Sequence, residues 1–341
     1  MTDRTIARLA QAFHIRVKSM RIVKSGVYRL ETEGGRAYAL KHMRYPVRRI
    51  LWMDRTLRRV RKNGFAGICW RDPRQIGGKP LFVRLRGKKA TYILTPWIQG
   101  RQPSPDSSDD LRACAAALAR FHLAGRRAAI PRQGALDLTG RWPAILKARL
   151  SLIRKYVSKA KTAGNGNELD VWLRKNGDDL LGRGEQALGL LERSPYRRLC
   201  RVSSRSRVLC HGDSGPKNFV FTGDDPKLID FETLRLDLRA YDLYRLIRLA
   251  CKHRGWSFAA AKAVLEGYGG VSKLEPGELR LVLAWLLFPN KAYKILSRSG
   301  KTNAKGRRAL TDELRSAAAA DLRLPSFLRE WDDYAREGGK T

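Results

Sequence analysis

The residues with the clearest chemical potential lie between positions 211 and 230. The stretch 211–218 reads His-Gly-Asp-Ser-Gly-Pro-Lys-Asn, so Asn218 follows Asp213 by five residues and Asp230 follows Asn218 by twelve. A loop aspartate can accept the proton of an attacking hydroxyl, and amide and carboxylate oxygens are ligands that Mg²⁺ prefers. The spacing therefore indicates a kinase-type phosphoryl-transfer site, with Asp213 as the base and Asn218 and Asp230 as metal ligands.

A lysine that could hold phosphate groups lies on a predicted strand. Residues 27–32 and 37–42 alternate around turn residues at 33–36, which is typical of a β-hairpin. Alternation places Ala37, Ala39 and Lys41 on one face of the second strand. Lys41 then stands beside two small side chains that leave room for a ligand, although a solvated lysine in a basic lobe would fit the same pattern.

The chain changes character at a stretch rich in proline. Residues 96–105 hold three prolines and one glycine, the composition of a loop or hinge. Before it the apolar period is mostly two, and after it the period is about 3.6. The sequence therefore predicts an α+β, bilobal, protein-kinase-like organisation. A small antiparallel β-rich lobe spans 1–95, a hinge spans 96–105, and a larger helical lobe spans 106–341.

Helix and turn signals place the remaining elements. In the small lobe, Pro46 opens a helix that ends at Asn63-Gly64. Ser108 is expected to cap the first helix of the large lobe. The other expected elements are a hairpin over 81–85 and 91–95 with a turn at 87–89, helices over 143–161, 166–193 and 237–335, a strand over 207–210, and a hairpin over 219–221 and 227–229.

Composition excludes several classes of protein. With 43% hydrophobic and 30% charged residues, the chain has the composition of a folded globule. Its longest apolar run, 281–288, is far shorter than the roughly 20 residues of a membrane-spanning helix. No apolar signal segment follows Met1, and the five scattered cysteines form no C-x-x-C pair. We therefore expect reduced thiols, no membrane span and a cytoplasmic location.

The net charge is strongly positive, with 69 Lys and Arg against 32 Asp and Glu, formally +37. Such an excess attracts polyanions, yet no signature for base recognition is present, so we expect no specific nucleic-acid partner. Residues 213–242 are the exception, with seven acids against four bases. An acidic island in a basic chain again indicates a cation site.

These motifs resemble the protein-kinase-like superfamily in its aminoglycoside phosphotransferase and choline kinase branch, whose catalytic loop reads H-G-D-x-x-x-x-N. Within that branch the chain looks most similar to the CotS/YutH-type spore coat kinase-like proteins. The resemblance covers roughly residues 20 to 300. Besides the catalytic loop, the stretches that carry it are 92–101, 118–122, 194–196, 237–243 and 288–289.

The resemblance implies ATP and Mg²⁺ as cofactors and a set of nucleotide-binding residues. Lys41 corresponds to the strand lysine that holds nucleotide phosphates, and Asp54, the only acid of its helix, to the acid that pairs with it. Asp54 as a surface helix acid is the open alternative. Ser25 and Gly26 correspond to the phosphate-covering turn, and Leu94 to a residue at the nucleotide site.

Four further residues have roles that the resemblance or the residue types suggest. Asp242 is expected to brace the catalytic loop through backbone hydrogen bonds, and His211 to pack that loop. Glu232 either assists a second metal or is solvated, with the solvated role preferred. His122, on an apolar helix face, is expected to be a satisfied core histidine.

Two functions from different classes follow. The first is an ATP- and Mg²⁺-dependent phosphotransferase that acts on a hydroxyl of a small molecule or glycan precursor, with an anionic acceptor favoured by the basic charge. The second is a catalytically inactive structural spore coat protein that binds coat proteins or polyanionic surfaces. Either would be made in the mother-cell cytoplasm and could end in the spore coat.

Overall fold

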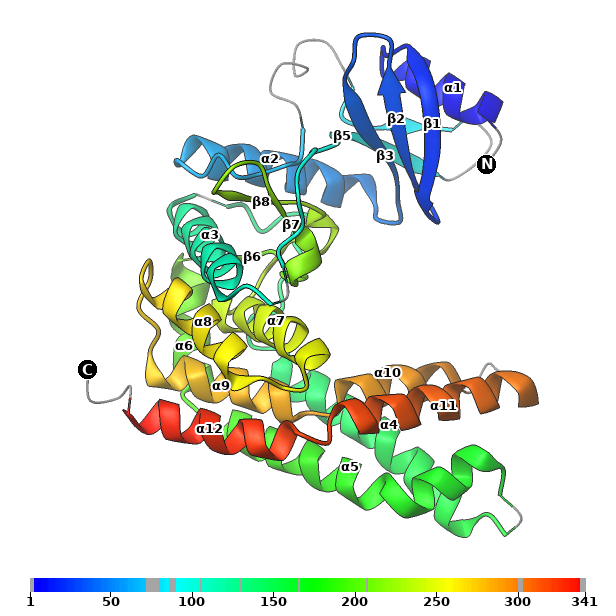
Figure 1. The fold of residues 1–341 in the computed structure, drawn as a ribbon, viewed down its shortest axis with the longest axis vertical. Helices are drawn as coiled ribbons and strands as arrows, with labels where there is room; N and C mark the ends of the chain where they lie inside the picture. The colour runs from blue at the N-terminus through cyan, green and yellow to red at the C-terminus, as the bar shows by residue number, and fades with distance from the viewer. Residues whose placement is uncertain are drawn as a thin grey trace.

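The computed structural model of the protein describes residues 3–71, 80–85, 90–104, 106–128, 130–164, 166–206, 208–299 and 303–337. It has a small β-rich lobe and a larger helical lobe, as the sequence predicts (Figure 1). The expected turn at 87–89 and the last hinge residue, 105, lie outside the described residues.

The small lobe is built on a five-stranded antiparallel sheet with strand order β1-β2-β3-β5-β4. Period-two alternation places Leu30 and Leu40 on one face, where Leu9 of the N-terminal helix and Phe13, just after it, cover them. Both predicted hairpins are present. The elements are α1 (Asp3–Ala12), β1 (Val17–Lys24), β2 (Val27–Thr32), β3 (Ala37–Met43), β4 (Val83–Arg84) and β5 (Thr91–Pro96).

Helix α2 (Val47–Lys62) follows β3 and connects the sheet to the helical lobe. Pro46 is its N-cap and Asn63 its C-cap, in agreement with the expected ends. Its buried residues Ile50, Met53 and Leu57 belong to the main core of the helical lobe, and Figure 1 shows α2 lying along α3. The apolar stripe of α2 therefore attaches the small lobe to the large one.

The large lobe is mainly helical and carries the short strands of the catalytic region. Its helices are α3 (Ser108–Arg127), α4 (Trp142–Thr162), α5 (Glu168–Arg193), α6 (Tyr196–Ser206), α7 (Arg239–Cys251), α8 (Phe258–Gly269), α9 (Pro276–Leu287), α10 (Asn290–Ser299), α11 (Ala304–Ala320) and α12 (Leu324–Glu337). Its strands are β6 (Leu209–Cys210), β7 (Phe219–Phe221), β8 (Pro226–Leu228) and β9 (Arg235–Leu236).

Two local expectations differ from the structure. The cap of α3 is Ser107, whose hydroxyl accepts a hydrogen bond from the Asp110 backbone N–H, rather than Ser108. Helix α6 had no predicted counterpart, because its arginines and serines obscure a short apolar stripe.

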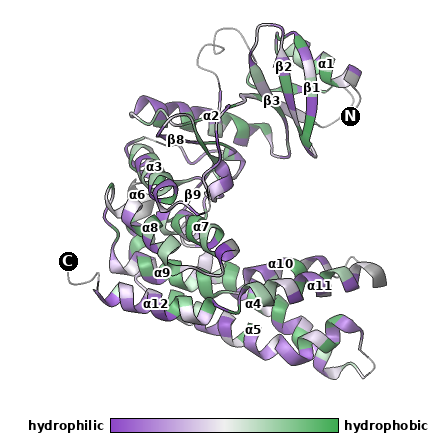
Figure 2. Ribbon diagram, viewed as in Figure 1, coloured by the Kyte–Doolittle hydropathy of each residue, from purple (hydrophilic) through white to green (hydrophobic). Residues whose placement is uncertain are grey.

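Apolar side chains line the interior of the helical lobe, while the outer faces of its helices are hydrophilic (Figure 2). All five cysteines are buried and unpaired, as expected. Within the described residues, no helix has the length and apolar character needed to cross a membrane.

Candidate active site

The catalytic loop follows strand β6 and brings Asp213 and Asn218 together. Nδ2 of Asn218 donates to the Asp213 carbonyl oxygen at 2.5 Å and to Asp213 Oδ2 at 3.2 Å. Gly212 has φ +85°, and a side chain there would collide with the Thr233 carbonyl, so the sharp turn requires glycine. The loop thus fixes the carboxylate of Asp213 at the start of the 3₁₀ turn η2 (Pro216–Asn218).

Asp242 braces this loop from helix α7, as expected. Its Oδ2 accepts the His211 backbone N–H at 2.6 Å, and its Oδ1 accepts the Gly212 N–H at 2.7 Å. The Ser214 hydroxyl donates to the Asp242 carbonyl at 2.6 Å. Burial opposes ionisation, but hydrogen bonding and charge from His122 and nearby His211 hold the pKa of Asp242 below its usual value.

The two histidines of this region have structural roles. His211 is buried; its Nε2 lies 2.8 Å from the Ile229 carbonyl, and burial lowers its pKa. His122 contacts Tyr268 and Asp242 through its two ring nitrogens. Both residues therefore fit the packing roles that the sequence suggested.

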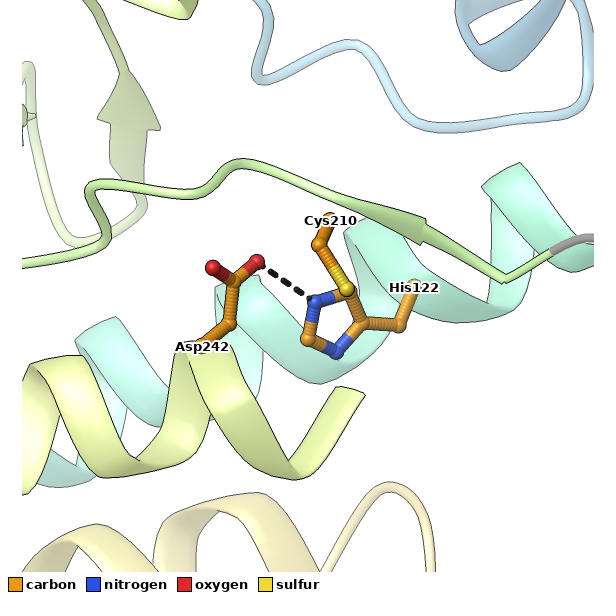
Figure 3. A group of neighbouring side chains, drawn as sticks. All are labelled: His122, Cys210 and Asp242. Atoms are coloured by element: carbon orange, nitrogen blue, oxygen red, sulfur yellow. Dashed lines mark hydrogen bonds and ion pairs between the residues drawn. The ribbon is translucent and has the colours of Figure 1, made fainter. Parts of the chain in front are cut away.

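His122, Asp242 and the Cys210 thiol form a compact buried group (Figure 3). Their candidate ligand atoms lie within 4.8 Å of one another. However, the Asp242 carboxylate already accepts three N–H groups, both His122 nitrogens are engaged, and burial raises the pKa of Cys210 well above its usual value. A neutral thiol beside saturated neighbours indicates a support for the loop rather than a metal centre.

The second acidic loop places Asp230 beside the strand lysine. Nζ of Lys41 lies 2.9 Å from Asp230 Oδ1, and Nζ of Lys24 lies 3.5 Å from Oδ2. Asp230 has φ +64°, a left-handed conformation that turns the chain after β8. Burial opposes ionisation, but Lys41 and Lys24 keep the pKa of Asp230 below its usual value.

Glu232 is half-buried rather than fully solvated. Its Oε1 lies 3.8 Å from Lys41 Nζ, so it shares that ammonium group with Asp230. Burial and the neighbouring charge of Asp230 raise the pKa of Glu232. Among the described residues, two acids therefore surround the Lys41 ammonium.

The two acidic loops are joined by their backbones. The Ile229 N–H donates to the Asn218 carbonyl at 3.0 Å, which holds Asn218 against the residue that precedes Asp230. Because the amide nitrogen of Asn218 is engaged with Asp213, its amide oxygen is the atom that it can offer to a cation. An ionised carboxylate that already attracts two ammonium groups, beside an amide oxygen, fits the hard-oxygen donor set of Mg²⁺.

A cleft of about 430 Å³ lies between the two lobes above Asp230. Ala39 and Lys41 line it from β3, as the alternation predicts, and Thr95 lines it from β5. Lys24 and Val27, which flank the turn at Ser25 and Gly26, also line it. The cleft has small apolar walls and a charged end, the arrangement that a nucleotide base and its phosphates require.

Two residues expected at the nucleotide site lie elsewhere. Asp54 is buried, accepts a hydrogen bond from the Trp70 indole at 3.1 Å and pairs with Arg58 at 2.9 Å; Lys41 pairs with Asp230 instead. Leu94 packs on the face of the sheet that α1 covers, because adjacent residues of a strand point to opposite faces and Thr95 points to the cleft. Asp54 therefore anchors α2, and Thr95 replaces Leu94 at the cleft.

Sequence reasoning missed one partner of Asp213. Arg245 of helix α7 forms an ion pair with Asp213 Oδ1. It lies three residues after Asp242, almost one helical turn away, so both can approach the same loop. That spacing was the available signal, but one arginine among 69 basic residues carried no distinguishing mark.

Two curated relatives share part of the sequence. The homoserine kinase of Afipia carboxidovorans is 31% identical over 221 residues, which is 64% of this chain and 59% of that protein. The homoserine kinase of Allorhizobium ampelinum is 29% identical over 211 residues, 61% of this chain and 56% of that protein. The chain thus spans between a half and three fifths of the length of these relatives.

Solved structures share the whole fold. An aminoglycoside phosphotransferase from Alicyclobacillus acidocaldarius superposes with a TM-score of 0.78 at 20% identity, over 99% of this chain and 97% of that chain. Spectinomycin phosphotransferase superposes with a TM-score of 0.64 at 14% identity, over 93% and 94% of the two chains. These similarities show the kinase-like fold.

A family comparison covers most of the chain. The phosphotransferase enzyme family matches residues 24–282, a range that includes both acidic loops and the strand lysine. The protein therefore belongs to the phosphotransferase enzyme family.

Proposed function

We propose that the protein is an active ATP- and Mg²⁺-dependent phosphotransferase that phosphorylates a hydroxyl group of a small molecule. The observation that carries this proposal is that two acidic loops are joined beside the cleft. Asp230 of the second acidic loop pairs with Lys41 at the cleft, and the Ile229 N–H bonds the carbonyl of Asn218, which in turn holds Asp213. The homoserine and aminoglycoside kinases among the similar proteins support a small acceptor.

Each side chain has a definable task in this reaction. Asp213 accepts the proton of the acceptor hydroxyl as its oxygen bonds to the γ-phosphorus and the bond to ADP breaks. Lys41 neutralises phosphate oxygens, and the apolar walls of the cleft hold the base. Asp242 acts at a distance, because its hydrogen bonds to the loop fix the position of Asp213.

Asn218 and Asp230 would hold the Mg²⁺ ion. When bound, the ion supplies positive charge that shields the phosphate oxygens during transfer. Lys41 and Lys24 occupy the Asp230 carboxylate in this structure. Nucleotide phosphates offer these ammonium groups an alternative anionic partner, which makes the carboxylate available to the metal.

The alternative function, a structural protein without turnover, has less support. An inactive relative has no need to retain Lys41, Asp213, Asn218 and Asp230, yet all four are present. Asn218 bonds Asp213, Lys41 pairs with Asp230, and a backbone hydrogen bond joins the two loops. The spore coat association and the mother-cell location that the resemblance implies stay predictions.

Transfer of the γ-phosphate tests the proposal. Wild-type protein with MgATP should release ADP when a small hydroxyl compound is added, in a panel that includes homoserine and spectinomycin, the acceptors that similar proteins are named for. Asp213→Asn should lower this rate by about 10²- to 10⁴-fold, because it removes the proton acceptor, and should leave nucleotide affinity within about twofold. Asp224→Asn, at an exposed hairpin position, is the matched control.

Two results would contradict the proposal. Equal acceptor-dependent ADP release by wild type and Asp213→Asn would remove Asp213 from the reaction. Absence of ADP release with every acceptor, together with unimpaired coat assembly by Asp213→Asn, would favour the structural alternative.

A further inference from the structure

Four cationic side chains from three helices lie near one another, and two of them interact with Asp213. They are Arg149 of α4, Arg245 and Arg248 of α7, and Lys294 of α10, here called the cation cluster. Arg245 pairs directly with Asp213, and Lys294 interacts electrostatically with Asp213 and with the three arginines. Figure 1 shows α4 and α10 side by side beneath α7, so separate parts of the chain build this cluster.

The cation cluster lacks enough acceptors within the described part of the chain. Nε of Arg245 and Nη1 of Arg248 are buried without a hydrogen-bond partner there. Partial burial, followed by the charges of Arg245, Arg149 and Arg248, lowers the pKa of Lys294, while Asp213 acts in the opposite direction. Buried N–H groups without acceptors cost free energy, and an incoming anion would remove that cost.

Neighbouring side chains fix the position of the Arg149 guanidinium. It donates to Asn290 Oδ1 at 2.6 Å and lies over the rings of Trp142 and Tyr293, at 5.6 and 5.1 Å from their centroids. Asn290 is fixed in turn by the Tyr244 hydroxyl at 3.2 Å. A guanidinium positioned in this way loses little further side-chain entropy when it binds a ligand.

On the basis of the proposed function, we propose that the cation cluster binds an anionic group, a carboxylate or a phosphate, of the hydroxyl acceptor. Guanidinium groups match both anions through paired N–H donors. The cation cluster adjoins Asp213, the group that would receive the hydroxyl proton. Binding of a polyanion would need only exposed surface charges and would not need cations beside Asp213. A cationic acceptor would add to the repulsion that Lys294 already experiences.

Acceptor binding would also change the environment of Asp213. Arg245 now occupies Asp213 Oδ1. An acceptor anion competes for the Arg245 guanidinium. Once Arg245 pairs with that anion, Asp213 Oδ1 is free to take the hydroxyl proton. The acceptor anion would thus favour the arrangement of Asp213 that transfer needs.

Four three-carbon probes that share hydroxyl groups test this inference. They are glycerol, glycerate, glycerol 3-phosphate and 3-amino-1,2-propanediol, added at equal ionic strength to protein saturated with Mg²⁺ and the non-hydrolysable nucleotide AMP-PNP. The unfolding temperature should rise with the two anions and remain unchanged with the neutral and cationic probes. The anion that binds more tightly identifies the acceptor group as carboxylate or phosphate.

Variants of Lys294 test whether the anionic probe binds at the cation cluster. Lys294→Gln should weaken binding of the anionic probe about tenfold, because it removes one charged donor, and Lys294→Arg should restore most of it. Lys155→Gln removes the same charge from an exposed position on α4 and should leave the affinity unchanged, which controls for the overall charge of +37.

The outcomes separate this inference from the proposed function. If the nucleotide stabilises the protein but the anions do not, or if their effect persists in Lys294→Gln, the anionic acceptor is wrong and the phosphotransferase proposal stands. Tighter binding of the cationic probe would also overturn the inference. If Mg²⁺ and AMP-PNP fail to stabilise the protein, the proposed function falls, and the acceptor assignment falls with it.

Discussion

At the scale of single residues, Asp213 and Asp242 lie close together but differ in exposure and in partners. Asp213 is half-exposed and held by Asn218 and Arg245, whereas Asp242 behind it is fully buried. The exposed carboxylate is available for chemistry, and the buried one holds the backbone that presents it. In the proposed reaction, the half-exposed Asp213 would take the proton, whereas the buried Asp242 of α7 positions the loop, because their burial and partners differ.

Asp242→Asn should destabilise the protein by about 3 kcal/mol at neutral pH, because an amide NH₂ would face backbone N–H donors in a buried place. The folded pKa of Asp242 lies below its unfolded value, so its stabilising contribution is present above about pH 4 and is lost as the pH falls through the folded pKa. Urea unfolding from pH 3 to 7 should show a wild-type-to-variant difference that narrows at low pH.

The exposed Asp225, which pairs with the surface residue Arg120, supplies the control. Asp225→Asn should change the free energy of unfolding by less than about 1 kcal/mol at every pH. A penalty for Asp242→Asn that stays constant across the pH range would contradict the assignment of an ionised, loop-bracing carboxylate.

At the scale of elements, the sequence predicted those features of the site that depend on residues close together in the chain. The alternation of 37–42 places Ala39 and Lys41 at the cleft, and the loop spacing brings Asp213 and Asn218 together. The partners of Asp54 could not be foreseen, because Trp70 lies beyond the end of its helix and reaches it only in the folded chain. Likewise, Arg245 meets Asp213 only through the packing of α7 on the loop.

Two helical glycines differ in the space around them. Close packing requires glycine at position 267, whereas open space at position 182 allows a larger residue. A Cβ at Gly267 of α8 would lie 2.6 Å from the Arg112 Cα of α3, where backbone cannot move aside. A Cβ at Gly182, inside α5, would meet nothing within 4 Å. Gly267→Ala should therefore cost about 1–3 kcal/mol, whereas Gly182→Ala should stabilise the protein by about 0.5–1 kcal/mol.

Urea midpoints of the two variants measure this contrast. The same added methyl group should shift the midpoint down at position 267 and up at position 182. An upward shift in both variants would show that helix propensity, not the contact between α3 and α8, governs these positions.

At the scale of the whole molecule, the positive charge and the acidic loops have separate roles. The net charge of +37 implies strong, salt-sensitive attraction to polyanions. Against that background, Asp230 and Glu232 share the Lys41 ammonium, whereas Arg245 of the cation cluster pairs with Asp213. In the proposed reaction, the first group would serve the metal nucleotide and the second the anionic acceptor.

Thermal unfolding with and without MgATP tests whether the cleft binds a metal nucleotide, and it needs no acceptor. At about 100 times its dissociation constant, the ligand should stabilise the wild type by about 2.7 kcal/mol, a rise of a few degrees for a chain of this size. The rise should require Mg²⁺, disappear in Asp230→Asn and persist in Asp224→Asn. An equal rise in Asp230→Asn, or no rise in the wild type, would contradict the account.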